Sequence, residues 1–267
     1  GRALQGVAAG LLIPALSAMM VDTETAYRPD TAAAWNTAAP MSGLAIGALG
    51  ASLALDVTNR PVGLVFGLLV GAFVLAAAAI WAIPESAPHT PRLRPGPMFS
   101  VPPRARGMLV MSTPAIVAGW ATNGLFLALG TSLMNNEFDA QTHVEQALVI
   151  VILAVSGVAT AMAVRRRSPR LITIYGAAAL AVGTTASLVA LGAQSYPGYL
   201  AAAAIVGSGF GTAFMGALRS IIPLAEAHER AALMSVIYTV SYVAFGVPAI
   251  MAGLLVPALG YGGTMTA

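Results

Sequence analysis

Two arginines lie in or beside long apolar runs, where a charged side chain is costly. Arg2 opens the run GRALQGVAAGLLIPALSAMM, and Arg219 lies near the end of another, in FMGALRSIIP. A charge in a membrane helix costs at least about 2.5–3.5 kcal/mol, so it persists where it is paired or functional. Arg2 is therefore a candidate for substrate binding or for proton coupling. The alternative is that Arg2 looks buried only because the sequence starts beside it. Arg219 either reaches the membrane interface with its guanidinium or faces a cavity.

The other titratable residues do not form a catalytic or metal-binding pattern. All ten acidic residues lie at the ends of apolar runs or between them, as do His89, His143 and His228. No two histidines have zinc-ligand spacing, and a chain without cysteine has no Cys-based metal or redox centre. The cluster Glu226-Ala-His228-Glu229 is typical of a solvated loop. We therefore predict no catalytic residue, no metal and no cofactor.

The composition indicates that lipid is the solvent for most of the surface. Of 267 residues, 58% are hydrophobic and only 9% are charged, whereas an average soluble domain has about 25% charged residues. All thirteen basic residues are arginine, which together with the high alanine content is typical of a GC-rich bacterial genome. The arginines cluster in short loops, a pattern that indicates membrane topology rather than nucleic-acid binding.

Eight apolar runs are long enough to cross a bilayer, which takes about 20 helical residues. They lack the polar face of helices in soluble proteins, and they are too long and too little alternating for a β-barrel. We predict an all-α integral membrane protein with eight transmembrane helices, at roughly residues 3–21, 32–55, 61–83, 107–134, 145–164, 171–193, 198–222 and 232–256.

The loops between these spans form two sets that differ strongly in arginine content. One set holds ten arginines, and the other holds only Arg60. By the positive-inside rule, the arginine-rich set faces the cytoplasm. This set consists of the segments around Arg28, 84–106, 165–170 and 224–231.

The longest loop, residues 84–106, holds seven prolines and is predicted to be an extended cytoplasmic linker. It divides the chain into residues 1–83, with three spans, and residues 107–267, with five. The tail GYGGTMTA is typical of a turn followed by the start of a sixth span in this second part.

These features together resemble the major facilitator superfamily. Arg2, Gln5 and Gly6 match the Arg-x-x-Gln-Gly signature that opens the family's fourth helix, and Ile83-Pro84-Glu85-Ser86 resembles the exit from its sixth. The resemblance implies two pseudo-symmetric helical bundles joined by a cytoplasmic linker. It also implies that the chain is truncated and runs from the fourth helix to the eleventh, with the first three helices missing.

Two segments depart from the family's patterns. SGLAIGALGAS keeps Gly43 and Gly47 of an exporter signature, but alanine and serine replace its proline and final glycines. VRRRSPR keeps the charge of a basic signature but lacks its acidic residue and glycine. The first resemblance favours export, in the manner of an antiporter.

The resemblance also suggests site residues, because the family's first, fourth, seventh and tenth helices line a central cavity. Candidate substrate contacts are Trp120, Asn123 and Phe126, with Trp120 and Asn123 three apart on one helix face; packing and helix–helix hydrogen bonding are the alternatives. Arg2, Arg219, Asn36 and Gln5 are further candidates. Several glycines are expected to allow close helix packing, or helix bending during transport. They are Gly6, Gly43, Gly47, Gly207, Gly209 and Gly211. Tyr238 and Tyr242, four apart, favour packing.

The function that follows is secondary transport by alternating access, with a site near the middle of the membrane. No phosphate-binding Gly-x-x-x-x-Gly-Lys-[Ser/Thr] is present, so an ion gradient is the expected energy source. We predict a monomeric exporter of a small molecule in the bacterial inner membrane, coupled to protons, with no nucleic-acid partner and no enzymatic activity. The alternatives are a membrane-embedded transferase and a non-transporting sensor or scaffold.

Overall fold

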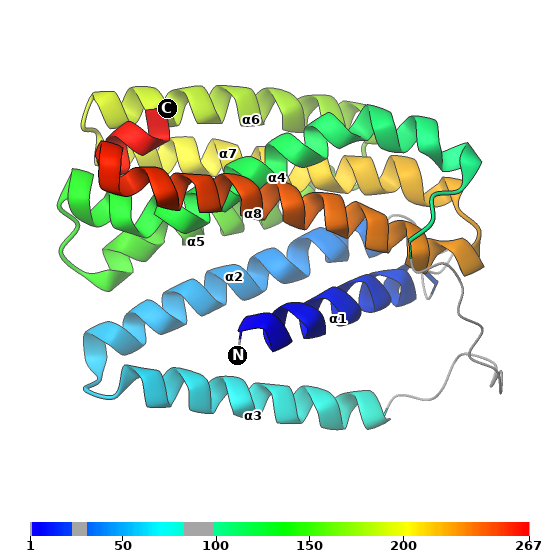
Figure 1. Ribbon diagram of the computed structural model, residues 1–267, viewed down its shortest axis with the longest axis horizontal. Helices are drawn as coiled ribbons and strands as arrows, with labels where there is room; N and C mark the ends of the chain where they lie inside the picture. The colour runs from blue at the N-terminus through cyan, green and yellow to red at the C-terminus, as the bar shows by residue number, and fades with distance from the viewer. Residues whose placement is uncertain (1, 23–30, 83–98, 267) are drawn as a thin grey trace.

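The protein is described here by a computed structural model that covers residues 2–22, 31–82 and 99–266. Every regular element in these ranges is helical, and the long helices run roughly along one axis (Figure 1). The elements are α1 (Arg2–Asp22), α2 (Thr31–Val57), α3 (Pro61–Ala82), α4 (Pro103–Phe138), α5 (His143–Val164), α6 (Pro169–Gly192), α7 (Tyr196–Ile221), the short 3-10 helix η1 (Ile222–Leu224) and α8 (Ala227–Thr266). The prediction of an all-α membrane protein with eight long helices is confirmed.

Seven of these helices, α2 to α8, are long and apolar enough to cross a membrane, and α1 offers a shorter apolar stretch, Leu4–Ser17. Most predicted spans agree with the helices within a few residues. The helix predicted at 107–134 instead covers Pro103–Phe138. It starts earlier because proline at the first helical position needs no N–H partner and already has a helical φ. Residues 84–98 of the predicted linker lie outside the described ranges.

The last predicted span, 232–256, is part of the longer helix α8. Within α8 the backbone departs from helical geometry at Gly260, which has φ 72° and ψ 176°. Only glycine adopts such a conformation without steric cost. The turn and following helix start predicted for the tail therefore correspond to a break at Gly260 and the short helical segment after it.

Polar side chains at the loops explain where several helices begin. Thr142 and Glu145 form a capping box at the start of α5, with reciprocal hydrogen bonds to each other's backbone N–H. Ser168 and Ser195 accept from the backbone N–H groups of Leu171 and Gly198 at the starts of α6 and α7. Proline follows each of these serines within the first turn, where its missing N–H costs nothing.

Burial differs sharply between the helices. α7 lies in the middle of the assembly and packs on α4, α5 and α6, whereas no described residue of α3 is buried. The apolar side chains of α3 are exposed, up to 96% for Trp81. Such a surface is stable when lipid, rather than water, surrounds it. α1 packs mainly on α8, and α2 packs mainly on α5.

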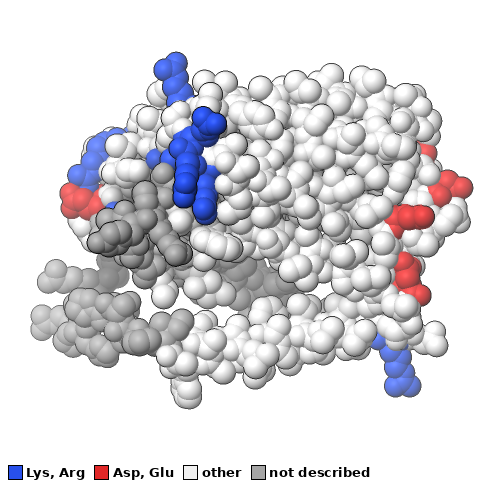
Figure 2. Space-filling view, turned by 180° about the vertical axis from the view of Figure 1, so that it is seen from behind, with Lys and Arg blue, Asp and Glu red and all other residues white. Residues whose placement is uncertain are grey.

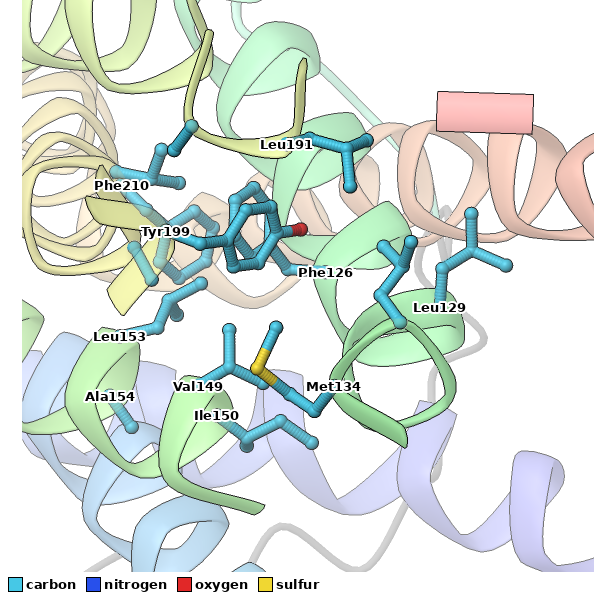
Figure 3. Packing of buried hydrophobic residues seen from close by; sticks show 14 of the residues in the cluster. Phe126, Leu129, Met134, Val149, Ile150, Leu153, Ala154, Leu191, Tyr199 and Phe210 are labelled. Carbon is cyan, nitrogen blue, oxygen red and sulfur yellow. The ribbon is translucent and has the colours of Figure 1, made fainter. Parts of the chain in front are cut away.

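The buried apolar side chains form two clusters. One is built around Phe126, Leu153 and Tyr199, and Figure 3 shows its side chains meeting between α4, α5 and α7. The other is built around Ile116 and Leu218 and includes residues of α2, α4, α6, α7 and α8. Trp120 packs against both clusters, so its position in α4 marks the junction between them.

The charged side chains gather towards the two ends of the molecule and leave an uncharged belt between them (Figure 2). At one end, Arg104 at the start of α4 pairs with Glu226 and Glu229 before and in α8. At the other end, Asp56 of α2 contacts His143 of α5. The belt between the ends has the polarity that a bilayer core requires.

Candidate substrate cavity

A cavity of about 210 Å³ lies where α1 and α2 face α4, α7 and α8. It therefore lies between the helices that precede residues 83–98 and those that follow them. Its lining is mostly apolar and aromatic. The lining residues are Ile13, Asn36, Thr37, Pro40, Met41, Leu44, Trp120, Asn123, Leu127, Phe210, Phe214, Tyr238, Tyr242 and Phe245.

Trp120 is the centre of the aromatic part of this lining. Its ring meets those of Phe210 and Phe214 edge-on, with ring centroids 5.3 and 5.4 Å apart, and those of Tyr242 and Phe245 at 5.7 and 6.2 Å. Phe210 and Phe214 are four residues apart on α7 and therefore share one helix face. Each such aromatic contact adds about 0.5–1.5 kcal/mol beyond area burial. The contacts hold three helices around the cavity in a defined arrangement.

Three polar atoms of lining residues have no hydrogen-bond partner among the described residues. They are Nδ2 of Asn36, Nε1 of Trp120 and Oδ1 of Asn123. Both asparagines are buried, with 6% and 4% of their surface exposed. An unsatisfied buried polar group costs about 1–3 kcal/mol, so three on one cavity are costly for stability alone. A bound molecule that supplies the partners would explain why they are there.

Two other polar side chains of the lining, those of Thr37 and Tyr238, are already engaged in hydrogen bonds. Thr37 donates its hydroxyl proton to the Ala33 carbonyl at 3.1 Å, within α2. The hydroxyls of Tyr238 and Ser17 lie 3.1 Å apart and link α8 to α1. Among the described lining residues, the buried polar atoms without a hydrogen-bond partner therefore belong to the two asparagines and Trp120.

The structure brings three of the predicted site residues together, namely Asn36, Trp120 and Asn123. Phe126 does not line the cavity; it is 1% exposed and stacks on Tyr199, with ring centroids 5.6 Å apart. At about 100° per helical residue, positions 120 and 123 share a face of α4, whereas position 126 is turned away from Trp120 by about 120°.

The candidates at the N-terminus and on α7 lie elsewhere. Gln5 is exposed and does not belong to the lining, and the side chain of Arg2 lies outside the described part of the structure. Arg219 donates to the carbonyl oxygens of Arg165 and Arg167, at 2.8 and 2.7 Å. It thus binds the loop between α5 and α6 rather than the cavity, and it satisfies carbonyls that follow a helix end.

The predicted packing glycines fall into two groups. A Cβ on Gly209 would lie 2.7 Å from the Leu180 backbone nitrogen, one on Gly211 would lie 2.6 Å from the Gly157 carbonyl oxygen, and one on Gly207 would collide with the Leu153 carbonyl. These glycines let α7 approach α5 and α6 closely. The second group consists of Gly6, Gly43 and Gly47, and no described atom lies within 4 Å of the corresponding Cβ position.

Several lining residues were not expected from the sequence. Phe210 and Phe214 lie in a segment whose glycines indicate helix packing, and the spacing of Tyr238 and Tyr242 favours packing as well. Their four-residue spacings show a shared helix face, but do not show what that face contacts. No group of three potential metal-ligating side chains is found in the ranges that the structure describes.

A comparison with protein-family models supplies the family. The model described as Major Facilitator Superfamily matches residues 1–249. The chain belongs to the major facilitator superfamily. Neither the comparison with curated proteins nor that with solved structures gave a match. This major facilitator protein is thus a multi-pass helical membrane transporter, and its cavity lies between two groups of membrane helices.

Proposed function

We propose that this major facilitator protein carries a small molecule across the membrane through the cavity between α1–α2 and α4, α7 and α8. The cavity's position supports this proposal best. Transporters built from two helical units bind their substrate between the units and expose it to each side in turn. A site inside one group of helices would stay on the same side whenever the groups moved.

Two polar contacts, at different heights along the helices, connect α1 and α2 to the remaining helices. A rocking motion of the two groups would have to break them. At one end of the molecule, the Asp56 carboxylate accepts hydrogen bonds from the backbone N–H groups of His143 and Val144, at 3.2 and 3.1 Å. It also lies 2.6 Å from the His143 ring nitrogen. The carboxylate thus binds the positive end of the α5 helix dipole.

The second contact joins α1 to α8 through Ser17 and Tyr238, at the cavity. Breaking the Asp56 contact frees the end of α2 from α5, and breaking the Ser17–Tyr238 contact frees α1 from α8. In the proposed cycle, these two contacts open at different steps, so that the cavity is never open to both sides together.

The finer assignments also belong to the proposal. The arginine-rich loops face the cytoplasm of a bacterial inner membrane, following the positive-inside rule. The direction is export, which the partial signature at Gly43 and Gly47 supports. An ion gradient, with protons as the coupling ion, supplies the energy, and the protein works as a monomer.

A flux assay tests this proposal. The protein, in the length that its gene encodes, is reconstituted into liposomes with an imposed pH gradient, and gradient-dependent movement of a panel of small aromatic compounds is measured. Leu127→Trp, which fills the cavity, is expected to abolish the flux, whereas Trp35→Phe, at an exposed position of α2, leaves it unchanged. Flux that persists in Leu127→Trp would contradict the proposal.

A further inference from the structure

The hydrogen-bonding groups that the cavity leaves open specify a kind of molecule. We infer that the cavity binds a small, uncharged aromatic compound that carries both a hydrogen-bond acceptor and a donor, as a carboxamide does. This inference rests on the proposed function and narrows it to a substrate class. It follows from the charge, the donors and acceptors, and the volume of the lining.

The absence of charged side chains from the described lining argues against an ionic ligand. A charged group that leaves water for such a site loses its hydration, and no side chain of opposite charge in the described lining replaces it. The aromatic rings do not replace it for an anion, because the faces of aromatic rings are electron-rich.

A cation differs from an anion in this respect, because aromatic rings attract cations to their faces. Two of the three unpartnered atoms, Nδ2 of Asn36 and Nε1 of Trp120, are N–H donors. Donors present positive hydrogen atoms and repel a cation, and they require an acceptor such as a carbonyl oxygen. The third atom, Oδ1 of Asn123, is an acceptor and requires a donor such as an amide N–H.

The volume sets the size of the ligand. An apolar cavity of about 150 Å³ holds benzene, and this cavity measures about 210 Å³. It therefore accommodates one aromatic ring with a substituent of a few heavy atoms. The rings of Phe210, Phe214 and Tyr242 stand at steep angles to the Trp120 ring. A flat aromatic ligand can join this T-shaped arrangement.

Three molecules of nearly the same shape isolate the effect of charge: benzamide, benzoate and benzamidinium. Their binding to the protein in lipid nanodiscs at pH 7 is measured by titration calorimetry, and heat from uptake by lipid is subtracted with the Leu127→Trp variant. We expect benzamide to bind about tenfold more tightly than either ion. Equal or tighter binding of an ion, or no binding of any of the three, would overturn the inference.

A pair of tryptophan variants tests the hydrogen bond. Trp120→Phe keeps an aromatic ring but removes the N–H, and is expected to weaken benzamide binding about fivefold. Trp35→Phe makes the same change at a side chain that is 55% exposed and outside the lining, and is expected to change nothing. Equal effects of the two substitutions would contradict the role of Trp120. If Trp120→Phe does not fold, the comparison of benzamide, benzoate and benzamidinium on the unmodified protein still tests the inferred ligand class.

The flux assay separates this inference from the proposed function. Selective binding of benzamide without flux of any compound would contradict transport while leaving the inference intact. Flux of ionic compounds through a cavity that shows no preference for benzamide would overturn the inference while leaving transport intact.

Discussion

Replacing Gly211 by alanine tests the close packing of α7 on α5. The added Cβ would lie 2.6 Å from the Gly157 carbonyl oxygen and 3.0 Å from its carbonyl carbon, both of them backbone atoms. Ordinary van der Waals contact begins near 3.4 Å. No side-chain rotation relieves this overlap, so the two helices have to move apart.

The cost follows from what this separation does to the interface. An opening of about 0.5–1 Å forfeits a quarter to a half of the dispersion energy of each contact, and overpacking typically costs about 1–3 kcal/mol. Because backbone opposes backbone here, we expect about 3 kcal/mol. At about 2–4 °C per kcal/mol for a chain of this size, the unfolding midpoint falls by about 6–12 °C.

The assay is thermal unfolding of the purified protein in one detergent, followed by loss of the monodisperse peak in size-exclusion chromatography. Gly253→Ala is the matched control, because no atom of the described residues lies within 4 Å of its Cβ position on α8. Alanine there is expected to leave the midpoint unchanged or raise it slightly, since alanine favours helix over glycine. A Gly211→Ala midpoint equal to that of Gly253→Ala would refute the packing argument.

Three further predictions concern the ends of the helices. Arg219→Ala is expected to destabilise the protein by about 1.5–3 kcal/mol, because two charge-assisted hydrogen bonds to backbone carbonyls are lost. Hydrogen exchange in the loop at 165–168 is expected to become faster. Unchanged exchange there would contradict the prediction. Asp56→Ala removes the acceptor for two N–H groups at the start of α5. Hydrogen exchange of the Val144 amide is therefore expected to become about tenfold faster. An unchanged exchange rate would show that the Asp56 contact does not stabilise the start of α5. Arg104→Ala, although it breaks two ion pairs, is expected to shift the unfolding midpoint by less than about 2 °C, because exposed pairs contribute little; a larger shift would show that the pairs act as a network.

The positions of the helices could be predicted from the sequence, because each helix depends on the residues within it and at its ends. Long apolar runs and clustered arginines identify the spans, and Ser168, Thr142 and Gly260 mark helix boundaries in terms of hydrogen bonding and backbone geometry. The structure places the predicted candidates Asn36, Trp120 and Asn123 on one cavity. They are polar or amphipathic residues in apolar runs, and the family resemblance assigned the helix of Trp120 and Asn123, though not that of Asn36, to a central cavity.

The remaining lining could not be predicted, because it depends on how helices face one another. Phe210 and Tyr242 are apolar or amphipathic residues in helices where such residues are common, and only the tertiary arrangement brings them to Trp120. Phe126 was predicted to contact substrate because it lies close to Asn123 in sequence. In the structure it stacks on Tyr199, away from the cavity. Arg219 binds loop carbonyls, partners that no spacing along the chain reveals.

Side-specific labelling of the cavity tests the central claim most directly. Residues 1–267 contain no cysteine, so the thiol of Leu44→Cys is the one thiol in this stretch and lies on the α2 side of the cavity. A membrane-impermeant thiol reagent is added to either side of sealed proteoliposomes that contain the protein. Alternating access predicts labelling from both sides, slowed by benzamide, in vesicles that remain tight to ions. Labelling from one side only, under every gradient applied, would contradict it.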